Sequence, residues 1–382
     1  MASNLYCLVQ VTPWVGMKDA SSPAWYLAAG CALGAAATFL VYHLREGRKN
    51  DAVASPRVAG AGKSVETIAA VDTPIGPNTR YIISTSGRIS SMRRYKHLLR
   101  YILKVDIAYI VINTGGEEGD DDKPTRKIAA IDFCDAIRGL KAIGGAISKD
   151  IKGTVLHELD KVDNIAQAVG AVNTIVREED RLVGYNTDAE GFKIAIVQGI
   201  QEYKRSCKPK APPKSPASSY EARIRSKVKS CVCYGYGGVT AVVVAVLKSM
   251  GIEVYITGRR LEVAKTRARE LGVSTFDKSN HKPDLFVNAA PVTDFDSLEK
   301  IPNFLEALRT CRIAFDHELV GQTLVDHCKR NGIFHIPGRS MYWPQMMAQW
   351  RLFLKGIVPE KKLVSLRQLL EKADKMAQDD VC

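Results

Sequence analysis

The chain has 382 residues, which is enough for two domains of ordinary size. With 46% apolar and 25% charged residues it has the composition of a folded globular protein, and nothing repeats at the period of a solenoid. Nine scattered cysteines, an odd number, argue against a disulfide framework and favour a reducing compartment.

The net charge of +13 is unevenly placed. Nine Lys and Arg residues against two Glu fall between Gln201 and Ser230, around a basic Pro/Ser-rich insert at residues 203–219. Such a composition is typical of a solvated linker. Because the charge is local and no nucleic-acid-binding module is recognisable, we predict no nucleic-acid partner.

Residues 1–72 form an N-terminal extension that differs from the rest of the chain. Residues 25–44 (WYLAAGCALGAAATFLVYHL) contain no Asp, Glu, Lys or Arg and are long enough to span a bilayer as a helix. Arg45, Arg48 and Lys49 follow directly, so the positive-inside rule places the bulk of the chain on the cytoplasmic side. We therefore predict a hydrophobic N-terminal helix that anchors the protein to a membrane. Two alternatives stay open, a signal or organelle-targeting segment and a buried soluble helix.

From Arg80 the hydrophobic pattern alternates between strands and helices. The expected elements are strands at 80–85, 108–114 and 142–148, helices at 91–104 and 126–140, and a hairpin formed by VNTIV and RLVGYNTD around REED. Repeated β–α–β units predict a mostly parallel sheet, and hence an α/β domain.

A second alternation begins at Lys227. The strand VKSCVCYGYGG leads into glycines, and the helix VTAVVVAVLKSMG ends at Gly251. There follow the strand EVYITGRR, the helix LEVAKTRARELG, strands at 284–291, 312–316 and 333–336, and amphipathic helices at 340–355 and 362–377. This order predicts a doubly wound, Rossmann-type sheet. Cys231 and Cys233 point to the same face of its first strand, and we interpret them as core residues rather than a metal pair.

Three glycines, Gly235, Gly237 and Gly238, stand where the first strand of this second half turns into a helix. Glycine there permits a tight turn and lets a pyrophosphate approach the N–H groups at the helix N-terminus. The strand–turn–helix context therefore predicts a dinucleotide site, the alternative being an ordinary α/β turn.

The end of the next strand indicates which dinucleotide binds. An NAD site usually carries an acidic residue there, whereas this chain has Arg259 and Arg260. Arginine binds a 2′-phosphate and an acid would repel it, so we predict NADP as the cofactor. The alternative is that both arginines are solvated at a helix start.

Lys152 and Asp188 are the candidates for proton transfer. An ammonium beside a carboxylate in an occluded cleft can donate a proton to an alkoxide that forms as hydride arrives. Taken singly, Lys152 fits an ordinary solvated lysine, and Asp188 fits the cap of a helix beginning at Ala189. Neutral donors and acceptors for a polyol substrate come from Asn173 and Gln345. Serines that could hold a substrate carboxylate are Ser91 and Ser148.

Dispersed motifs, in this order, resemble those of the shikimate/quinate dehydrogenase family. The likeness extends from about Tyr81 to Gly356 and is carried by AISKDIK, GAVNT, NTD, GYGG, GRR and GRSMYWPQMMAQW. It implies a catalytic lysine at Lys152 and a catalytic aspartate at Asp188. It also implies substrate-binding roles for Asn173 and Gln345, a place for Ser148 at the family's threonine, and a place for Asn288 in the loop beside the nicotinamide.

Several positions depart from the family pattern. The first serine of the family's S-x-S aligns with Ile89, which leaves Ser91. The family's N-V-T and nicotinamide-loop motifs are altered too, and a family tyrosine falls at Glu318, whose charge would disfavour a nearby carboxylate. These changes predict a modified substrate pocket around a retained catalytic pair.

The resemblance implies a two-domain α/β enzyme that uses NADP and no metal. Residues 73–191 plus 339–382 would form the substrate-binding domain, and residues 192–338 the Rossmann domain. The expected reaction is reversible reduction of 3-dehydroshikimate to shikimate, a cyclic polyol carboxylate, by a monomer or homodimer. The alternatives are a quinate or other cyclitol dehydrogenase, and a non-catalytic membrane-tethered paralogue that binds ligand or regulates a partner.

Overall fold

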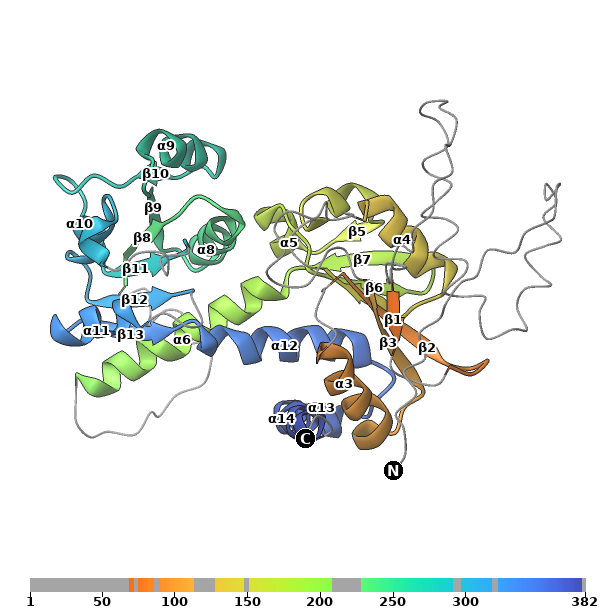
Figure 1. The fold of residues 1–382 in the computed structure, drawn as a ribbon. Helices are drawn as coiled ribbons and strands as arrows, with labels where there is room; N and C mark the ends of the chain where they lie inside the picture. Colours follow the sequence, from red (N-terminus) through yellow and green to blue (C-terminus); the bar gives the residue numbers. More distant parts are fainter. Residues whose placement is uncertain are drawn as a thin grey trace, which may run out of the picture. The chain divides into compact units, whose positions relative to one another are not determined.

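The computed structural model describes residues 69–71, 75–85, 90–112, 128–147, 151–207, 228–290, 297–317 and 322–379. The chain divides into two compact units (Figure 1). The first unit comprises Met1–Val162, Val172–Gly184 and Leu352–Cys382, and the second comprises Asp163–Ala171 and Tyr185–Arg351. The chain therefore passes from one unit to the other after Val162, Ala171, Gly184 and Arg351.

The described part of the first unit contains a seven-stranded sheet of order β1-β3-β2-β4-β6-β7-β5. Its strands are β1 (Ala69–Val71), β2 (Arg80–Ser84), β3 (Ile107–Ile112), β4 (Gly144–Ala146), β5 (Lys161–Val162), β6 (Thr174–Glu178) and β7 (Arg181–Tyr185). β2 runs parallel to β3 and β4, whereas β1 is antiparallel to β3 and β6 is antiparallel to β4. The predicted strands are confirmed, but the sheet is mixed because β1 and the β6–β7 hairpin reverse direction.

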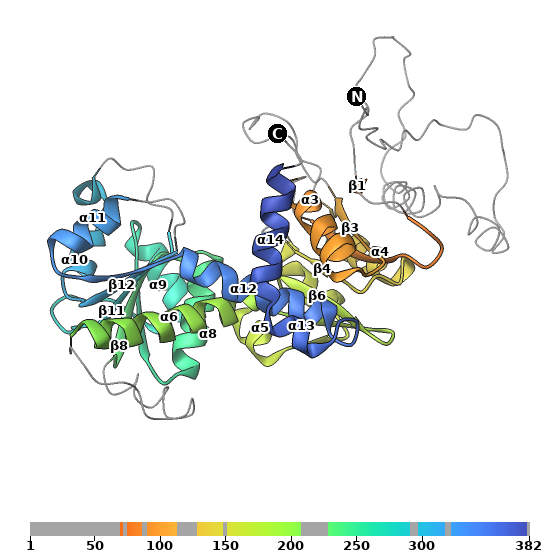
Figure 2. The same ribbon diagram turned by 90° about the horizontal axis from the view of Figure 1, so that it is seen from below.

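The first unit also contains several helices. They are α3 (Ser90–Lys96), the π-helix η2 (His97–Leu103), α4 (Ala130–Gly139), the 3₁₀ helix η4 (Thr154–Glu158), α13 (Glu360–Val364) and α14 (Leu366–Asp379). Each of the helices predicted at 91–104 and 362–377 is thus two consecutive elements. α14 lies beside α3 (Figure 2), and Arg94 forms an ion pair with Asp374 across that contact. A methyl group on Gly145 would lie 2.6 Å from the Phe133 ring, so α4 packs closely on β4.

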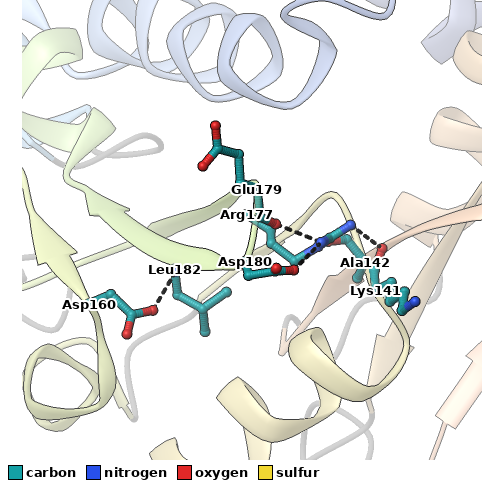
Figure 3. A network of polar contacts seen from close by, with 7 residues as sticks. All are labelled: Lys141, Ala142, Asp160, Arg177, Glu179, Asp180 and Leu182. Atoms are coloured by element: carbon teal, nitrogen blue, oxygen red, sulfur yellow. Dashed lines mark hydrogen bonds and ion pairs between the residues drawn. The ribbon is translucent and has the colours of Figure 1, made fainter.

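One arginine joins two turns of the first unit (Figure 3). Arg177 Nε donates to the Ala142 carbonyl at 3.1 Å, and its two terminal nitrogens donate to the carbonyls of Lys141 at 3.2 Å and Glu179 at 2.7 Å. The guanidinium therefore satisfies backbone acceptors of the α4–β4 turn and of the β6–β7 turn at once.

We expect Arg177→Ala to lower the free energy of unfolding by about 2 kcal/mol, because three carbonyls lose a charged donor. Arg177→Lys should recover only part of the loss, since an ammonium cannot span the same three acceptors. Arg181→Ala, an exposed arginine on neighbouring β7, is the matched control and should change little. Chemical denaturation of the purified variants measures this, and equal midpoints for the Arg177 and Arg181 variants would contradict the account.

Asp160 secures the same hairpin from its other side (Figure 3). Its carboxylate accepts the Leu182 backbone N–H at 2.6 Å and lies 3.6 Å from Arg138 Nη2. The Leu182 hydrogen bond, aided by the Arg138 charge, holds the pKa of Asp160 below its usual value of 3.8.

A folded-state pKa below the unfolded one means that Asp160 stabilises the fold above about pH 4, and that this contribution disappears as the pH falls through the lowered pKa. We therefore expect Asp160→Asn to melt below wild type at neutral pH, with the difference shrinking below about pH 4. Asp180→Asn, which changes a fully exposed carboxylate, is the control. A difference between Asp160→Asn and wild type that is constant across this range would rule the interpretation out.

The second unit holds a six-stranded parallel sheet of order β10-β9-β8-β11-β12-β13. Its strands are β8 (Ser230–Tyr234), β9 (Glu253–Thr257), β10 (Ser274–Thr275), β11 (Leu285–Asn288), β12 (Ile313–Asp316) and β13 (Phe334–Pro337). Strand order reverses between β8 and β11, so the doubly wound sheet predicted from the sequence is confirmed. In such sheets ligands bind at the carboxyl ends of the strands beside the reversal.

Helices cover both faces of this sheet. They are α5 (Asn164–Val169), α6 (Thr187–Ser206), α8 (Gly238–Ser249), α9 (Leu261–Glu270), η5 (Leu298–Lys300), α10 (Phe304–Leu308), α11 (Thr323–Arg330) and α12 (Arg339–Leu354). One apolar core joins α6, α8 and α9 to one face of the sheet, and another joins α10 and α11 to the other face. Gly199 lets α6 approach β13, because a methyl group there would overlap the Ile336 side chain.

The predicted membrane span at residues 25–44 lies outside the described residues, as do residues 208–219 of the basic insert. Among the residues that are described, no helix is both long and apolar enough to cross a bilayer.

Candidate functional site

The glycine turn after β8 begins with a residue that only glycine suits. Gly235 has a φ of 135°, which side chains rarely allow. Its N–H donates to the Thr257 carbonyl at 2.9 Å, which joins the turn to the end of β9. A methyl group on Gly235 would lie 3.0 Å from the Ala289 carbonyl carbon and oxygen. The turn therefore sits close against the backbone that follows β11.

The next glycines of the turn leave open space at a helix N-terminus. Gly237 is the N-cap of α8 and Gly238 its first residue, and a methyl group on either would meet no atom within 4 Å. Its N-cap residue, being glycine, provides no side-chain cap to this 12-residue helix. Uncapped N–H groups, the positive end of the helix dipole and open space together fit the pyrophosphate of a dinucleotide.

The carboxyl end of β9 presents arginines rather than an acid. Thr257 and Gly258 are buried, and Arg259 and Arg260 are exposed just before α9. Arg260 Nε donates to the Tyr236 hydroxyl at 3.2 Å. A pair of exposed guanidinium groups at this strand end fits the 2′-phosphate of NADP.

The ends of β11 and β12 are tied together by a buried pair. Asn288 Nδ2 donates to Asp316 Oδ1 at 2.9 Å, and Asn288 Oδ1 accepts the Ala290 N–H at 3.2 Å. Both side chains are almost wholly enclosed. This pair orients the loop that begins at Ala289, beside the reversal of strand order. Asn288 was predicted from its motif, whereas Asp316 was not, although an acidic residue at the end of an apolar strand was a signal for it.

Asp188 lies in the first turn of α6 and is half-buried. Asn186, not Asp188, caps this helix: its Oδ1 accepts the Ala189 N–H at 3.1 Å and its Nδ2 donates to the Ala171 carbonyl at 2.8 Å. The alternative that Asp188 serves only as the cap is therefore wrong. A negative charge in the first turn of a helix interacts favourably with the helix dipole.

Gln345 is brought to the same helix by a glycine. A methyl group on Gly191 would lie 2.8 Å from Gln345 Cβ and 2.8 Å from the Met341 carbonyl, so α12 packs directly on α6 at this point. Gly191 follows Asp188 by three residues, and residues three apart share a helix face. Two predicted site residues, Asp188 and Gln345, thus belong to one corner of the second unit.

Lys152 and Asn173 are joined within the first unit. The Lys152 carbonyl accepts the Val172 N–H at 2.8 Å, and the Asn173 carbonyl accepts the Ile147 N–H at 2.9 Å. Asn173 is buried and its Oδ1 accepts the Thr174 hydroxyl at 2.9 Å, whereas Lys152 is half-buried. Val172 and Asn173 of the GAVNT segment are therefore hydrogen-bonded to Lys152 and to Ile147, the residue that follows β4.

The two predicted serines lie wholly or partly outside the described part of the structure. Ser91 lies in α3, but its side chain is outside the description, and Ser148 falls outside the described residues. Lys152 belongs to the first unit and Asp188 to the second.

Comparison with known proteins agrees with this geometry, although no family model matches the chain. The NADP(+) shikimate dehydrogenase of Maridesulfovibrio salexigens is 28% identical over 256 residues, covering 65% of this chain and 84% of the relative. A solved shikimate 5-dehydrogenase-like protein has a TM-score of 0.56 at 23% identity, covering 80% of this chain and 100% of its own. The quinate dehydrogenase of Corynebacterium glutamicum, solved with NAD, has a TM-score of 0.53 at 20% identity, covering 77% and 98%.

The chain resembles the shikimate/quinate dehydrogenases in sequence and has the fold of their solved structures. Relative to the pattern of the shikimate/quinate dehydrogenases, it keeps the lysine, the aspartate and the glycine turn. The altered positions Ile89 and Glu318 lie outside the described residues, so the modified pocket stays a prediction.

The two cysteines of β8 are core residues, as predicted. Cys231 and Cys233 are fully buried, and burial raises the pKa of the Cys233 thiol to about 12. Thiols in that state are neutral at physiological pH and poor metal ligands. Among the described residues, no group of three or more His, Cys, Asp or Glu side chains is placed to hold a metal ion.

Proposed function

We propose that the chain is an NADP-dependent oxidoreductase that reversibly reduces 3-dehydroshikimate to shikimate. The observation that carries the proposal is the glycine turn between β8 and α8. There Gly237 and Gly238 leave open space at an uncapped helix N-terminus, in a sheet whose strand order reverses beside it. The motif order and the shikimate dehydrogenase relatives supply the substrate class.

The cofactor, when bound, supplies the hydride of the reduction. In this proposal the pyrophosphate lies on the N-terminus of α8, and Arg259 and Arg260 bind the 2′-phosphate. Asn288, fixed by Asp316, orients the backbone at the loop beside the nicotinamide. The arrangement of the described residues fits the cofactor at each of these points.

Lys152 is proposed to donate a proton to the substrate oxygen as the carbonyl becomes an alcohol. Its ammonium stabilises the negative charge that develops there, and it withdraws the proton in the reverse direction. Asp188 is proposed to orient the ammonium and the reacting hydroxyl group. Support comes from the first-turn position of Asp188 and from the backbone hydrogen bond that fixes Lys152 to Val172.

Substrate binding is assigned to four further side chains. Asn173 and Gln345 are proposed to hydrogen-bond the ring hydroxyls, and Ser91 and Ser148 to bind the carboxylate. Asn173 is supported by its burial beside the Lys152 segment, and Gln345 by its packing on the helix that carries Asp188.

Quinate or another cyclitol acid is the second candidate substrate. Two features favour it: a serine of the family's S-x-S is replaced by Ile89, and a quinate dehydrogenase is among the solved structures of the same fold. The direct test measures turnover of shikimate and quinate with NADP⁺ and NAD⁺, followed by the absorbance of reduced nicotinamide. We expect turnover with NADP⁺ and one of these acids. Saturable NADPH binding without turnover of any acid would instead support a non-catalytic paralogue.

Membrane attachment through residues 25–44, with the enzyme facing the cytoplasm, completes the proposal. It rests on the apolar sequence and on the basic residues that follow it. Fractionation of expressing cells tests it: the full chain should sediment with membranes, and a chain lacking residues 1–72 should not. Equal distribution of the two would refute the anchor.

A further inference from the structure

Tyr236 stands inside the glycine turn, between Gly235 and Gly237. Its side chain reaches the residue that precedes α9. Arg260 Nε donates to the Tyr236 hydroxyl at 3.2 Å, and the Arg260 guanidinium carbon lies 5.5 Å from the centroid of the tyrosine ring. Hydroxyl and ring therefore both engage one guanidinium group.

The ring lies over the end of β9. A methyl group on Gly258 would lie 3.0 Å from two carbons of the Tyr236 ring, so glycine is what admits the ring there. The Gly258 carbonyl accepts Asn303 Nδ2 at 3.0 Å, which fixes the peptide beneath the ring. In dinucleotide-binding sheets this strand end is where the adenosine ribose and its 2′ substituent bind.

The partner of Arg260 is neutral, and this matters for an anionic ligand. A phenol orients the guanidinium without cancelling its charge, whereas a carboxylate would compete with a phosphate for it. The carboxylate nearest in sequence, Glu262, instead pairs with Lys265 at 2.7 Å. Arg260 is thereby oriented and keeps its full charge toward solvent, where it is exposed.

We propose that Tyr236 is a positioning residue for cofactor choice: it holds Arg260 at the end of β9 to receive the 2′-phosphate of NADP, so that discrimination against NAD depends on it. The inference rests on the proposed dinucleotide function and adds a residue that controls its selectivity.

The Tyr236 ring packs against the apolar core but is not enclosed by it. Tyr236 is half-buried and lines an open hollow of about 420 Å³ together with Glu262, Val263, Thr266, Arg267 and Glu270. Its orientation depends on Arg260 and on the space above Gly258 as well as on this packing. Replacing Tyr236 is therefore expected to leave the fold intact, which equal melting temperatures would verify.

Binding of NADPH and NADH to the full-length chain, followed by nicotinamide fluorescence, tests the proposal. We expect Tyr236→Ala to weaken NADPH binding about three- to tenfold and to leave NADH binding unchanged. Tyr236→Phe, which keeps the ring, should weaken NADPH binding less than Tyr236→Ala does. Arg260→Ala should weaken NADPH binding more. Adding Tyr236→Ala to Arg260→Ala should not weaken NADPH binding further, because the tyrosine acts through the arginine.

Two additional variants sharpen the result. Gly258→Ala, which displaces the ring without touching Arg260, should also reduce the preference for NADPH. Tyr255→Phe removes a phenol hydroxyl from β9 in the same unit and should leave both affinities unchanged. A wild-type protein that binds neither dinucleotide would overturn the proposed function and this inference together. Two results would overturn this inference alone, given a wild-type protein that prefers NADPH. One is a Tyr236→Ala variant that keeps the preference. The other is a double variant in which the losses of NADPH affinity caused by Tyr236→Ala and Arg260→Ala are fully additive.

Discussion

Lys152→Ala is expected to lower kcat for shikimate oxidation by about 10²- to 10⁴-fold, the usual contribution of a positioned general acid or base. The loss should fall on kcat rather than on cofactor affinity, because the lysine is proposed to act on the reacting oxygen and not on the dinucleotide. Steady-state kinetics together with a separate NADPH titration measure the two quantities.

Lys161→Ala is the matched control for this prediction. Lys161 is an exposed lysine in β5 of the same unit, and its removal should leave kcat near that of wild type. If Lys152 and Asp188 act as a unit, combining Lys152→Ala with Asp188→Asn should be no slower than the slower single variant. A Lys152→Ala enzyme as fast as wild type would remove the lysine from the mechanism.

Gly237→Val is expected to weaken NADPH binding by at least about 100-fold, which corresponds to about 2.7 kcal/mol. The valine would occupy the open space at the N-terminus of α8 where the pyrophosphate is proposed to lie. Protein stability should hardly change, because a Cβ atom at Gly237 would meet no protein atom within 4 Å and its φ of −82° suits any residue. Fluorescence titration and thermal melting give both quantities.

Gly76→Val provides the control for that substitution. A methyl group on Gly76 would make only an ordinary contact, 3.8 Å from the Thr79 hydroxyl, and the residue belongs to the first unit. Its NADPH affinity should equal that of wild type. Unchanged NADPH binding by the folded Gly237→Val protein would show that the cofactor lies elsewhere.

The strand and helix periods were strong enough to predict five of the six described strands of the second unit. The run from Ser230 to Tyr234 followed by glycines fixes a buried strand and a tight turn, and both are present. Short strands escaped prediction: β5 and β10 have two residues each, too few to show a period. The π-helical turn of His97–Leu103 has the same apolar spacing as an α-helix over so short a length, so sequence does not separate them.

At the candidate site, the sequence was sufficient to predict which residues belong to the site. It was not sufficient to predict the contacts that these residues make. Asn186 and Asp188 are both good N-cap residues, and the choice between them depends on the bond from Asn186 to the Ala171 carbonyl, which only the folded chain makes. The Tyr236–Arg260 contact likewise joins residues 24 apart with no local sequence signal. The Asn288–Asp316 pair depends on β11 and β12 being neighbours in the sheet.

Transfer of hydride from the cofactor to the substrate carbon is the central claim, and isotope transfer tests it most directly. The purified chain is incubated with 3-dehydroshikimate and NADPH deuterated at the transferable position of the nicotinamide, and the product is analysed by mass spectrometry. The account predicts that the wild-type chain forms shikimate carrying one deuterium and that Lys152→Ala forms far less of this product. Recovery of 3-dehydroshikimate without reduction, or formation of shikimate that carries no deuterium, would contradict it.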